Sequence, residues 1–134
     1  TDHLDCFQTR VISTRLKEVL KPIVGNEAQF LPIRLEAEDC SQSIEDYFVM
    51  HVTATADCLD LDKTDHDGTG VPGDEVILRP GSPVALRLNA IDPKLHIMRD
   101  KRWFGNNLII REDLAKTLQG ERFTGLLFGK CAYS

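Results

Sequence analysis

The stretch Tyr-Phe-Val-Met-His-Val-Thr-Ala-Thr-Ala-Asp-Cys-Leu-Asp-Leu-Asp-Lys, residues 47–63, decides how the rest of the chain is arranged. Its first half, residues 47–53, is rich in aromatic and β-branched side chains, which favour a half-buried strand over a helix. Its second half keeps Leu59 and Leu61 at alternate positions among aspartates. We therefore expect a central strand that runs into an acidic turn, with the two leucines holding the turn against the end of the strand.

Length and composition favour a single domain that spans residues 1–134. Of these 134 residues 42% are hydrophobic, which is enough to bury one core without cross-links. The formal net charge is -5 and the isoelectric point is about 5.3. A surface for nucleic acid or anionic lipid requires clustered Lys and Arg, so we expect neither nucleic acid nor membrane as a partner. A neutral or basic protein fits this charge better.

Two features of the chain predict a cytoplasmic protein with reduced thiols. No run approaches the roughly 20 apolar residues of a membrane span, and residues 1–5 lack the features of a secretory signal. The four cysteines, Cys6, Cys40, Cys58 and Cys131, include no Cys-x-x-Cys pair, and a domain of this size needs no cross-links. We expect four free thiols, and the even number of cysteines leaves disulfides as the alternative.

Helical periodicity occurs twice in the chain. After Ser13 or Thr14 as N-cap, apolar residues at helical spacing alternate with charged ones and predict an amphipathic helix that ends at Pro22 and Gly25. Residues 111–118 repeat the pattern near the end of the chain and predict a second amphipathic helix.

Short apolar or alternating runs predict about six strands. Strands are expected at residues 29–35, 47–53, 84–88, 95–98 and 123–128, and residues 76–78 form a brief apolar run. Pro32 places the first strand at a sheet edge or at a bulge, and the short connection to the central strand predicts that these two are antiparallel neighbours. The predicted fold class is therefore α+β, a largely antiparallel sheet of about six strands with the two amphipathic helices on one face.

Several motifs in sequence order resemble one known family. They are Phe-Leu-Pro-Ile-Arg-Leu at 30–35, Glu-Asp-Tyr-Phe-Val-Met-His-Val at 45–52, Asp-Cys-Leu-Asp-Leu-Asp-Lys-Thr at 57–64 and, more weakly, Phe-Thr-Gly-Leu-Leu-Phe at 123–128. The pattern is similar to that of immunity proteins of bacterial polymorphic toxin systems, in the family typified by a myxobacterial protein. The resemblance covers most of the chain from Val11 onward. It implies a protein that binds and neutralises a cognate toxin domain, and it brings no catalytic residues. The glycine-rich segment at 65–74 and the Lys-Arg-Trp-Phe loop depart from the pattern.

Acidic side chains in the turn form the first candidate contact surface for such a partner. They are Asp57, Asp60, Asp62, Asp65 and Asp67. Carboxylates on an inhibitor can take the place of phosphates in a cationic active site, and complementary charge raises the association rate. Ordinary solvation of a loop, or capping of a nearby turn, accounts for the same residues.

The loop Arg-Asp-Lys-Arg-Trp-Phe, residues 99–104, is the second candidate contact surface. Arg and Trp are enriched at binding hot spots, so we select Arg99, Arg102, Trp103 and Phe104. In the alternative interpretation, Trp103 and Phe104 close the core while the basic side chains point into water.

The alternative function is a small metal-dependent or hydrolytic enzyme that uses Asp and His from the loops after the central strand. Residues 65–68, Asp-His-Asp-Gly, with Asp74 six residues beyond the glycine, imitate part of a calcium loop, but Lys63 stands where the first ligand belongs. No histidine spacing predicts zinc, and no local signature predicts a nucleophile. We expect no catalytic residue, metal or cofactor. A pocket shared by Asp57, Asp65 and His66 would favour the enzyme.

Overall fold

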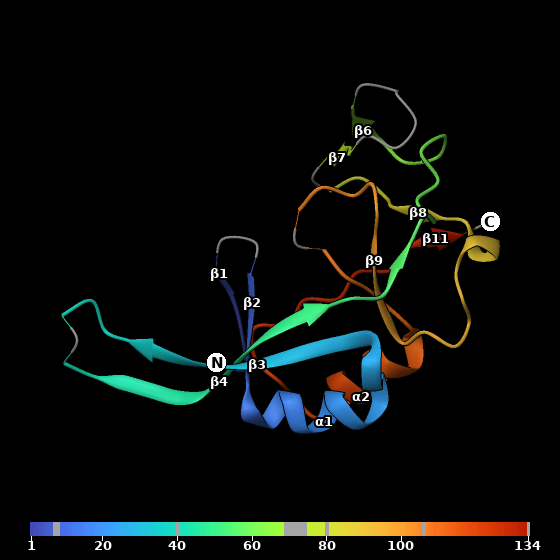
Figure 1. Cartoon of the computed structure of the whole chain (residues 1–134). Helices are drawn as coiled ribbons and strands as arrows, with labels where there is room; N and C mark the ends of the chain where they lie inside the picture. Colours follow the sequence, from blue (N-terminus) through green and yellow to red (C-terminus); the bar gives the residue numbers. More distant parts are fainter. Residues whose placement is uncertain (7–8, 40, 69–74, 80, 106, 134) are drawn as a thin grey trace.

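A computed structural model, which describes residues 1–6, 9–39, 41–68, 75–79, 81–105 and 107–133, has the predicted α+β class. Figure 1 shows the α-helices below a long antiparallel strand pair, with short strands above that pair. None of the described helices is long and apolar enough to span a membrane.

The largest sheet has four antiparallel strands in the order β1-β2-β4-β3. These strands are β1 (His3–Cys6), β2 (Thr9–Ser13), β3 (Ala28–Glu36) and β4 (Ser43–Val52). β4 pairs with β2 on one side and β3 on the other, so the predicted internal position of this strand and its antiparallel pairing with β3 are confirmed. β3 is the edge strand and contains Pro32, and its register shifts between Ile33 and Leu35, as the proline predicted.

The first helix, α1 (Thr14–Val24), begins at the predicted cap. The Ser13 side chain accepts a hydrogen bond from the backbone N–H of Leu16 at 3.2 Å, which satisfies one of the free donors of the first turn. The helix continues through Pro22 and ends before Gly25, whose φ of +53° suits a residue without a side chain. The 3-10 helix η1 (Gly25–Glu27) then leads into β3.

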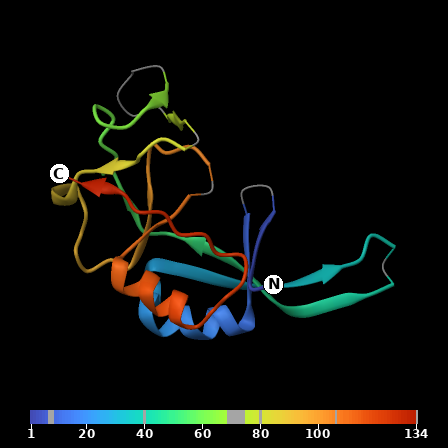
Figure 2. The same ribbon diagram turned by 180° about the vertical axis from the view of Figure 1, so that it is seen from behind.

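The second helix, α2 (Glu112–Gly120), packs with α1 into the same core. Figures 1 and 2 both show the two helices on one side of the β3–β4 pair. The core they share with β2, β3, β4 and β9 consists of Ile12, Leu16, Leu20, Val24, Ala28, Met50, Val52, Ile97, Leu114 and Leu118. The spacing of the leucines in both helices follows from the helical periodicity that the sequence shows.

The second half of the chain forms three small sheets around a second core. One has the order β10-β9-β5, and the others are the pairs β11-β8 and β6-β7. Their strands are β5 (Thr55–Ala56), β6 (His66–Asp67), β7 (Ile77–Leu78), β8 (Ala85–Leu86), β9 (Ile97–Asp100), β10 (Ile109–Ile110) and β11 (Ala132–Tyr133), and the 3-10 helix η2 (Leu88–Ala90) follows β8. The buried residues of the second core are Ala56, Cys58, Leu59, Val76, Leu86, Met98 and Ile109.

The prediction of one sheet of about six strands is therefore wrong, because the strands in the described part of the chain divide into sheets of four, three, two and two. The division begins at the end of β4. Thr53 and Ala54 still donate their backbone N–H groups to the carbonyl of Glu27, but the next strand, β5, pairs with β9 and not with the large sheet.

The predicted strand at residues 123–128 is also absent. This segment is held by hydrogen bonds to the side chain of Asp2 and forms no backbone ladder with another strand. The Asp2 carboxylate accepts hydrogen bonds from the N–H of Thr124 at 2.9 Å and from the Ser13 hydroxyl at 2.8 Å. Burial by itself would raise the pKa of Asp2, but these hydrogen bonds, with that from Arg15, outweigh it and lower the pKa to about 2. Gly125 adopts a φ of +80°, which interrupts an extended conformation.

Candidate functional site

The acidic turn, residues 57–67, lies against the second core. Cys58 and Leu59 are buried and Leu61 is half-buried in contact with that core, so the predicted apolar anchoring is confirmed. Backbone hydrogen bonds add to it. Asp60 donates to the Ala85 carbonyl at 2.9 Å, and Arg87 donates to the Cys58 carbonyl at 2.7 Å. The turn is thus fixed between β5 and β8.

Most carboxylates of the acidic turn are already matched by cations of the same chain. Asp57 lies 3.9 Å from Arg87 and Asp60 lies 4.0 Å from Lys63. The guanidinium of one arginine, Arg79, lies 3.3 Å from Asp65 and 3.0 Å from Asp67. Asp62 is exposed. Exposed ion pairs add little to stability, but they cancel much of the charge that the turn presents to a partner.

The four residues selected in the 99–104 loop have different environments. Arg99 is exposed but its Nε donates to the Val52 carbonyl at 2.8 Å. Arg102 is half-buried. Trp103 is half-buried against the second core, and Phe104 is 47% exposed. Trp103 therefore fits the core interpretation, whereas Phe104 remains available for contact.

Asp100 connects the acidic turn to this loop, and the sequence analysis did not select it. It is 6% exposed at the end of β9. One carboxylate oxygen accepts from the backbone N–H groups of Cys58 (2.8 Å) and Leu59 (3.0 Å), and the other accepts from those of Arg102 (2.8 Å) and Trp103 (3.2 Å). A single buried carboxylate thus orients both candidate contact segments. The sequence signal for this role is slight: one aspartate ends β9, two residues after the apolar pair Ile97-Met98.

The thiols that the structure describes are not poised as nucleophiles. Cys58 and Cys131 are free. Burial, the negative charge of Asp100 and a hydrogen bond to Asp100 raise the pKa of Cys58 to about 12, and burial raises the pKa of Cys131. The prediction of reduced thiols extends to Cys40 and to the side chain of Cys6, which lie outside the described residues.

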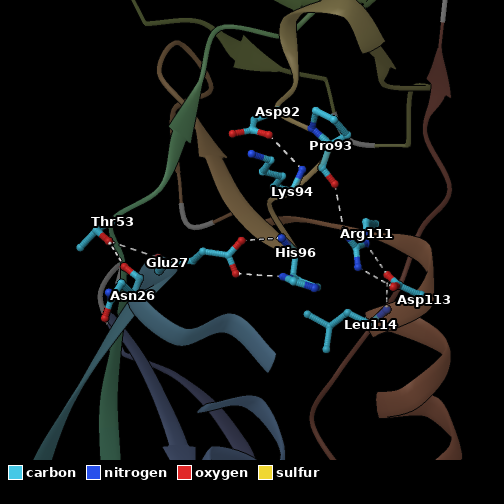
Figure 3. A network of polar contacts seen from close by, with 10 residues as sticks. All are labelled: Asn26, Glu27, Thr53, Asp92, Pro93, Lys94, His96, Arg111, Asp113 and Leu114. Atoms are coloured by element: carbon cyan, nitrogen blue, oxygen red, sulfur yellow. Dashed lines mark hydrogen bonds and ion pairs between the residues drawn. The ribbon is translucent and has the colours of Figure 1, made fainter. Parts of the chain in front are cut away.

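A polar network joins η1 to the starts of β9 and α2 (Figure 3). The Glu27 carboxylate accepts the backbone N–H of His96 at 2.6 Å, and its other oxygen lies 3.2 Å from the ring Nδ1 of His96. Arg111 donates its backbone N–H to the His96 carbonyl. Its Nε and Nη2 each donate a hydrogen bond to one carboxylate oxygen of Asp113, both at 2.7 Å. The latter contact lowers the pKa of Asp113 to about 2. Glu27 and Arg111 form hydrogen bonds to backbone groups, so this network links η1, the start of β9 and the start of α2.

Comparison with known families identifies the chain. The model of the immunity protein family Imm11 matches residues 2–133. The chain belongs to this family. The resemblance inferred from the motifs at 30–35, 45–52 and 57–64 is thereby confirmed. No curated protein matches the sequence.

The residues proposed for an enzyme each have a partner within the chain in this Imm11 member. Asp57 pairs with Arg87 and Asp65 with Arg79, while Nδ1 of His66 lies 2.8 Å from the Thr64 carbonyl. The cation between Asp65 and Asp67 is thus a guanidinium, and Asp74 of the calcium-like pattern lies outside the described residues. In the part of the chain that the structure describes, no three His, Cys, Asp or Glu side chains are grouped to hold a metal ion.

Replacing Trp103 with Ala in this Imm11 member is expected to lower the free energy of unfolding by about 2–3 kcal/mol, because the half-buried ring leaves a gap in the second core. The neighbouring Phe104→Ala, which removes an exposed ring, should change it by less than about 1 kcal/mol. Urea unfolding of both variants checks this. Equal stabilities for Trp103→Ala and wild type would show that the ring does not contribute to the core.

Proposed function

We propose that this protein binds a cognate bacterial toxin domain in the cytoplasm of the producing cell and neutralises it without catalysis. The observation that supports this most is the match of the Imm11 immunity protein family over residues 2–133. The net charge of -5 agrees with a protein partner and argues against nucleic acid or an anionic membrane. In this proposal residues 1–134 act as one binding domain that needs no metal or cofactor.

The acidic turn and the 99–104 loop are our first proposal for part of the contact surface. Its residues are Asp57, Asp60, Asp62, Asp65, Asp67, Arg99, Arg102, Trp103 and Phe104. The four hydrogen bonds to Asp100 support this choice, because they hold both segments in place before a partner arrives. A preorganised surface loses little conformational entropy on binding. Phe104 then offers an exposed aromatic ring for contact.

Co-expression tests this function. The probe is the C-terminal domain of a large secretion-type protein encoded beside this chain, expressed alone and together with the chain. Growth that is lost with the toxin domain alone and restored by co-expression is the expected result. A lack of rescue, with both proteins present in soluble form, would overturn the proposed function.

Titration of the purified toxin domain then separates binding from catalysis. A non-catalytic inhibitor must be present in equimolar amount, so residual toxin activity should fall linearly and reach its minimum near one equivalent. Full protection by a small fraction of an equivalent would require turnover. That outcome would favour the enzyme hypothesis over the binding hypothesis.

A further inference from the structure

The outer parts of β3 and β4 extend beyond the rest of the large sheet. β2 pairs with β4 only from Tyr47 to Met50, whereas β3 and β4 remain paired out to Glu36 and Ser43. Figures 1 and 2 show this strand pair projecting away from the body of the molecule. We call residues 34–46 the β3–β4 arm. Except for Leu35, which is half-buried, all of its described residues are exposed.

The arm carries most of the formal net charge of the protein. Its acidic residues are Glu36, Glu38, Asp39, Glu45 and Asp46, and its only basic residue is Arg34. Five carboxylates and one arginine give a net charge of -4, compared with -5 for the whole chain. Arg34 lies 2.9 Å from Glu45 and 3.5 Å from Glu36. The acidic turn also has five carboxylates, but Lys63, Arg79 and Arg87 pair with four of them.

Apolar side chains lie beside these charges. Leu31, next to the base of the arm, is 55% exposed, and Ile44 within the arm is 52% exposed. A strand pair that lacks a core of its own is only marginally stable in water, so burial against a partner would favour its ordered form. Exposed apolar residues with a charged rim are the composition of a protein-binding surface.

The charge decides which occupant fits the arm. A second copy of this chain would place one arm of charge -4 near another, and like charges oppose that contact. Nucleic acids and anionic membranes are repelled for the same reason. We propose that the β3–β4 arm binds a groove lined by Lys and Arg on the toxin domain, of the kind that holds phosphate groups of a substrate. This inference rests on the proposed function and identifies the chemistry of the partner's surface.

The test compares two variants with the same change in charge. The arm variant is Glu38→Gln/Asp39→Asn/Asp46→Asn, and the matched control is Glu18→Gln/Glu75→Gln/Glu121→Gln, which changes three exposed carboxylates outside the arm, the acidic turn and the 99–104 loop. Asn at position 39 keeps a side-chain oxygen for the N–H of Ser41, which Asp39 accepts at 2.9 Å. Association rates with the purified toxin domain are measured by stopped flow at about 20 mM and about 300 mM NaCl, since the higher salt shortens the range of the electrostatic attraction.

We expect the arm variant to associate about tenfold more slowly than wild type at low salt, with a smaller difference at high salt, and the control variant to slow by less than about threefold. Equal effects of the two variants would show a response to net charge alone and would overturn the proposal. So would an unchanged rate for the arm variant. If either result is found while wild type still binds the toxin domain and rescues growth, the proposed function is retained and only the proposal for the arm is overturned.

Light scattering of the free proteins tests whether a second copy of the chain occupies the arm. Wild type and the arm variant are both expected to be monomeric at low salt. A wild-type dimer that dissociates in the arm variant would assign the arm to a second copy of the chain and overturn the proposal. Wild type that neither binds nor protects against the toxin domain would overturn the proposed function, and the proposal for the arm with it.

Discussion

Replacing Asp100 with Ala is expected to lower the free energy of unfolding by about 3–5 kcal/mol, because it leaves four backbone N–H groups in a buried site without an acceptor. The donors of Cys58 and Leu59 fix the acidic turn, and those of Arg102 and Trp103 fix the loop after β9. Each lost partner costs the desolvation energy of the donor, because the site is 6% exposed and water does not replace the carboxylate there. Urea unfolding at neutral pH measures the change.

Two further variants define the cause of that effect. Asp100→Asn has nearly the same size but only one acceptor oxygen, so we expect a loss of about 2–3 kcal/mol. Asp92→Ala is the matched control, since the exposed Asp92 also accepts a backbone N–H, that of Lys94 at 2.9 Å, and water can take its place. It should cost less than about 1 kcal/mol. If Asp100→Asn were as stable as wild type, the carboxylate would not be organising the two segments.

Replacing Gly125 with Ala is expected to destabilise the protein by about 2–4 kcal/mol, which corresponds to a melting temperature lower by about 10 °C for a chain of this size. Two causes add. The φ of +80° is unfavourable for any residue with a side chain, and the new Cβ would lie 2.4 Å from the carbonyl oxygen of His3. A backbone atom cannot move aside as a flexible side chain does, so the C-terminal segment must separate from β1. Thermal unfolding followed by circular dichroism measures the effect.

Gly129→Ala serves as the control for Gly125→Ala. Gly129 lies in the same extended segment, and a Cβ added there meets no atom within 4 Å. This substitution should leave the melting temperature within about 2 °C of wild type. A similar result for Gly125→Ala would mean that the segment does not lie against β1 in solution.

The elements that the sequence predicted correctly depend on short stretches of chain. Ser13 caps α1 through the N–H of Leu16, three residues away, and Pro32 marks the edge strand because it lacks an N–H. Leu59 and Leu61 anchor the acidic turn as their alternation predicted. The family could likewise be inferred from motifs between residues 30 and 64, and the family match confirms it.

The elements that were missed depend on partners far away in the chain. The six-stranded sheet was wrong because the strands after β4 pair with one another, as β5 does with β9, and no periodicity encodes that pairing. The strand at 123–128 was wrong because Asp2 and β1 hold that segment through side chains and a positive φ at Gly125. The acidic turn and the 99–104 loop remain a proposed contact surface.

The sequence by itself determined the fold class, the family, the position of β4 and the overall acidity, since these follow from local hydrophobic patterns and from composition. Only the tertiary structure decided where the acidity is exposed. Arg79 and Arg87 pair with aspartates of the acidic turn that precede them by 12 to 30 residues, whereas the ion pairs described in the β3–β4 arm are those of Arg34 with Glu36 and Glu45. Whether a carboxylate pairs within the chain or faces a partner depends on its neighbours in space, and the order of residues in the chain does not reveal those neighbours.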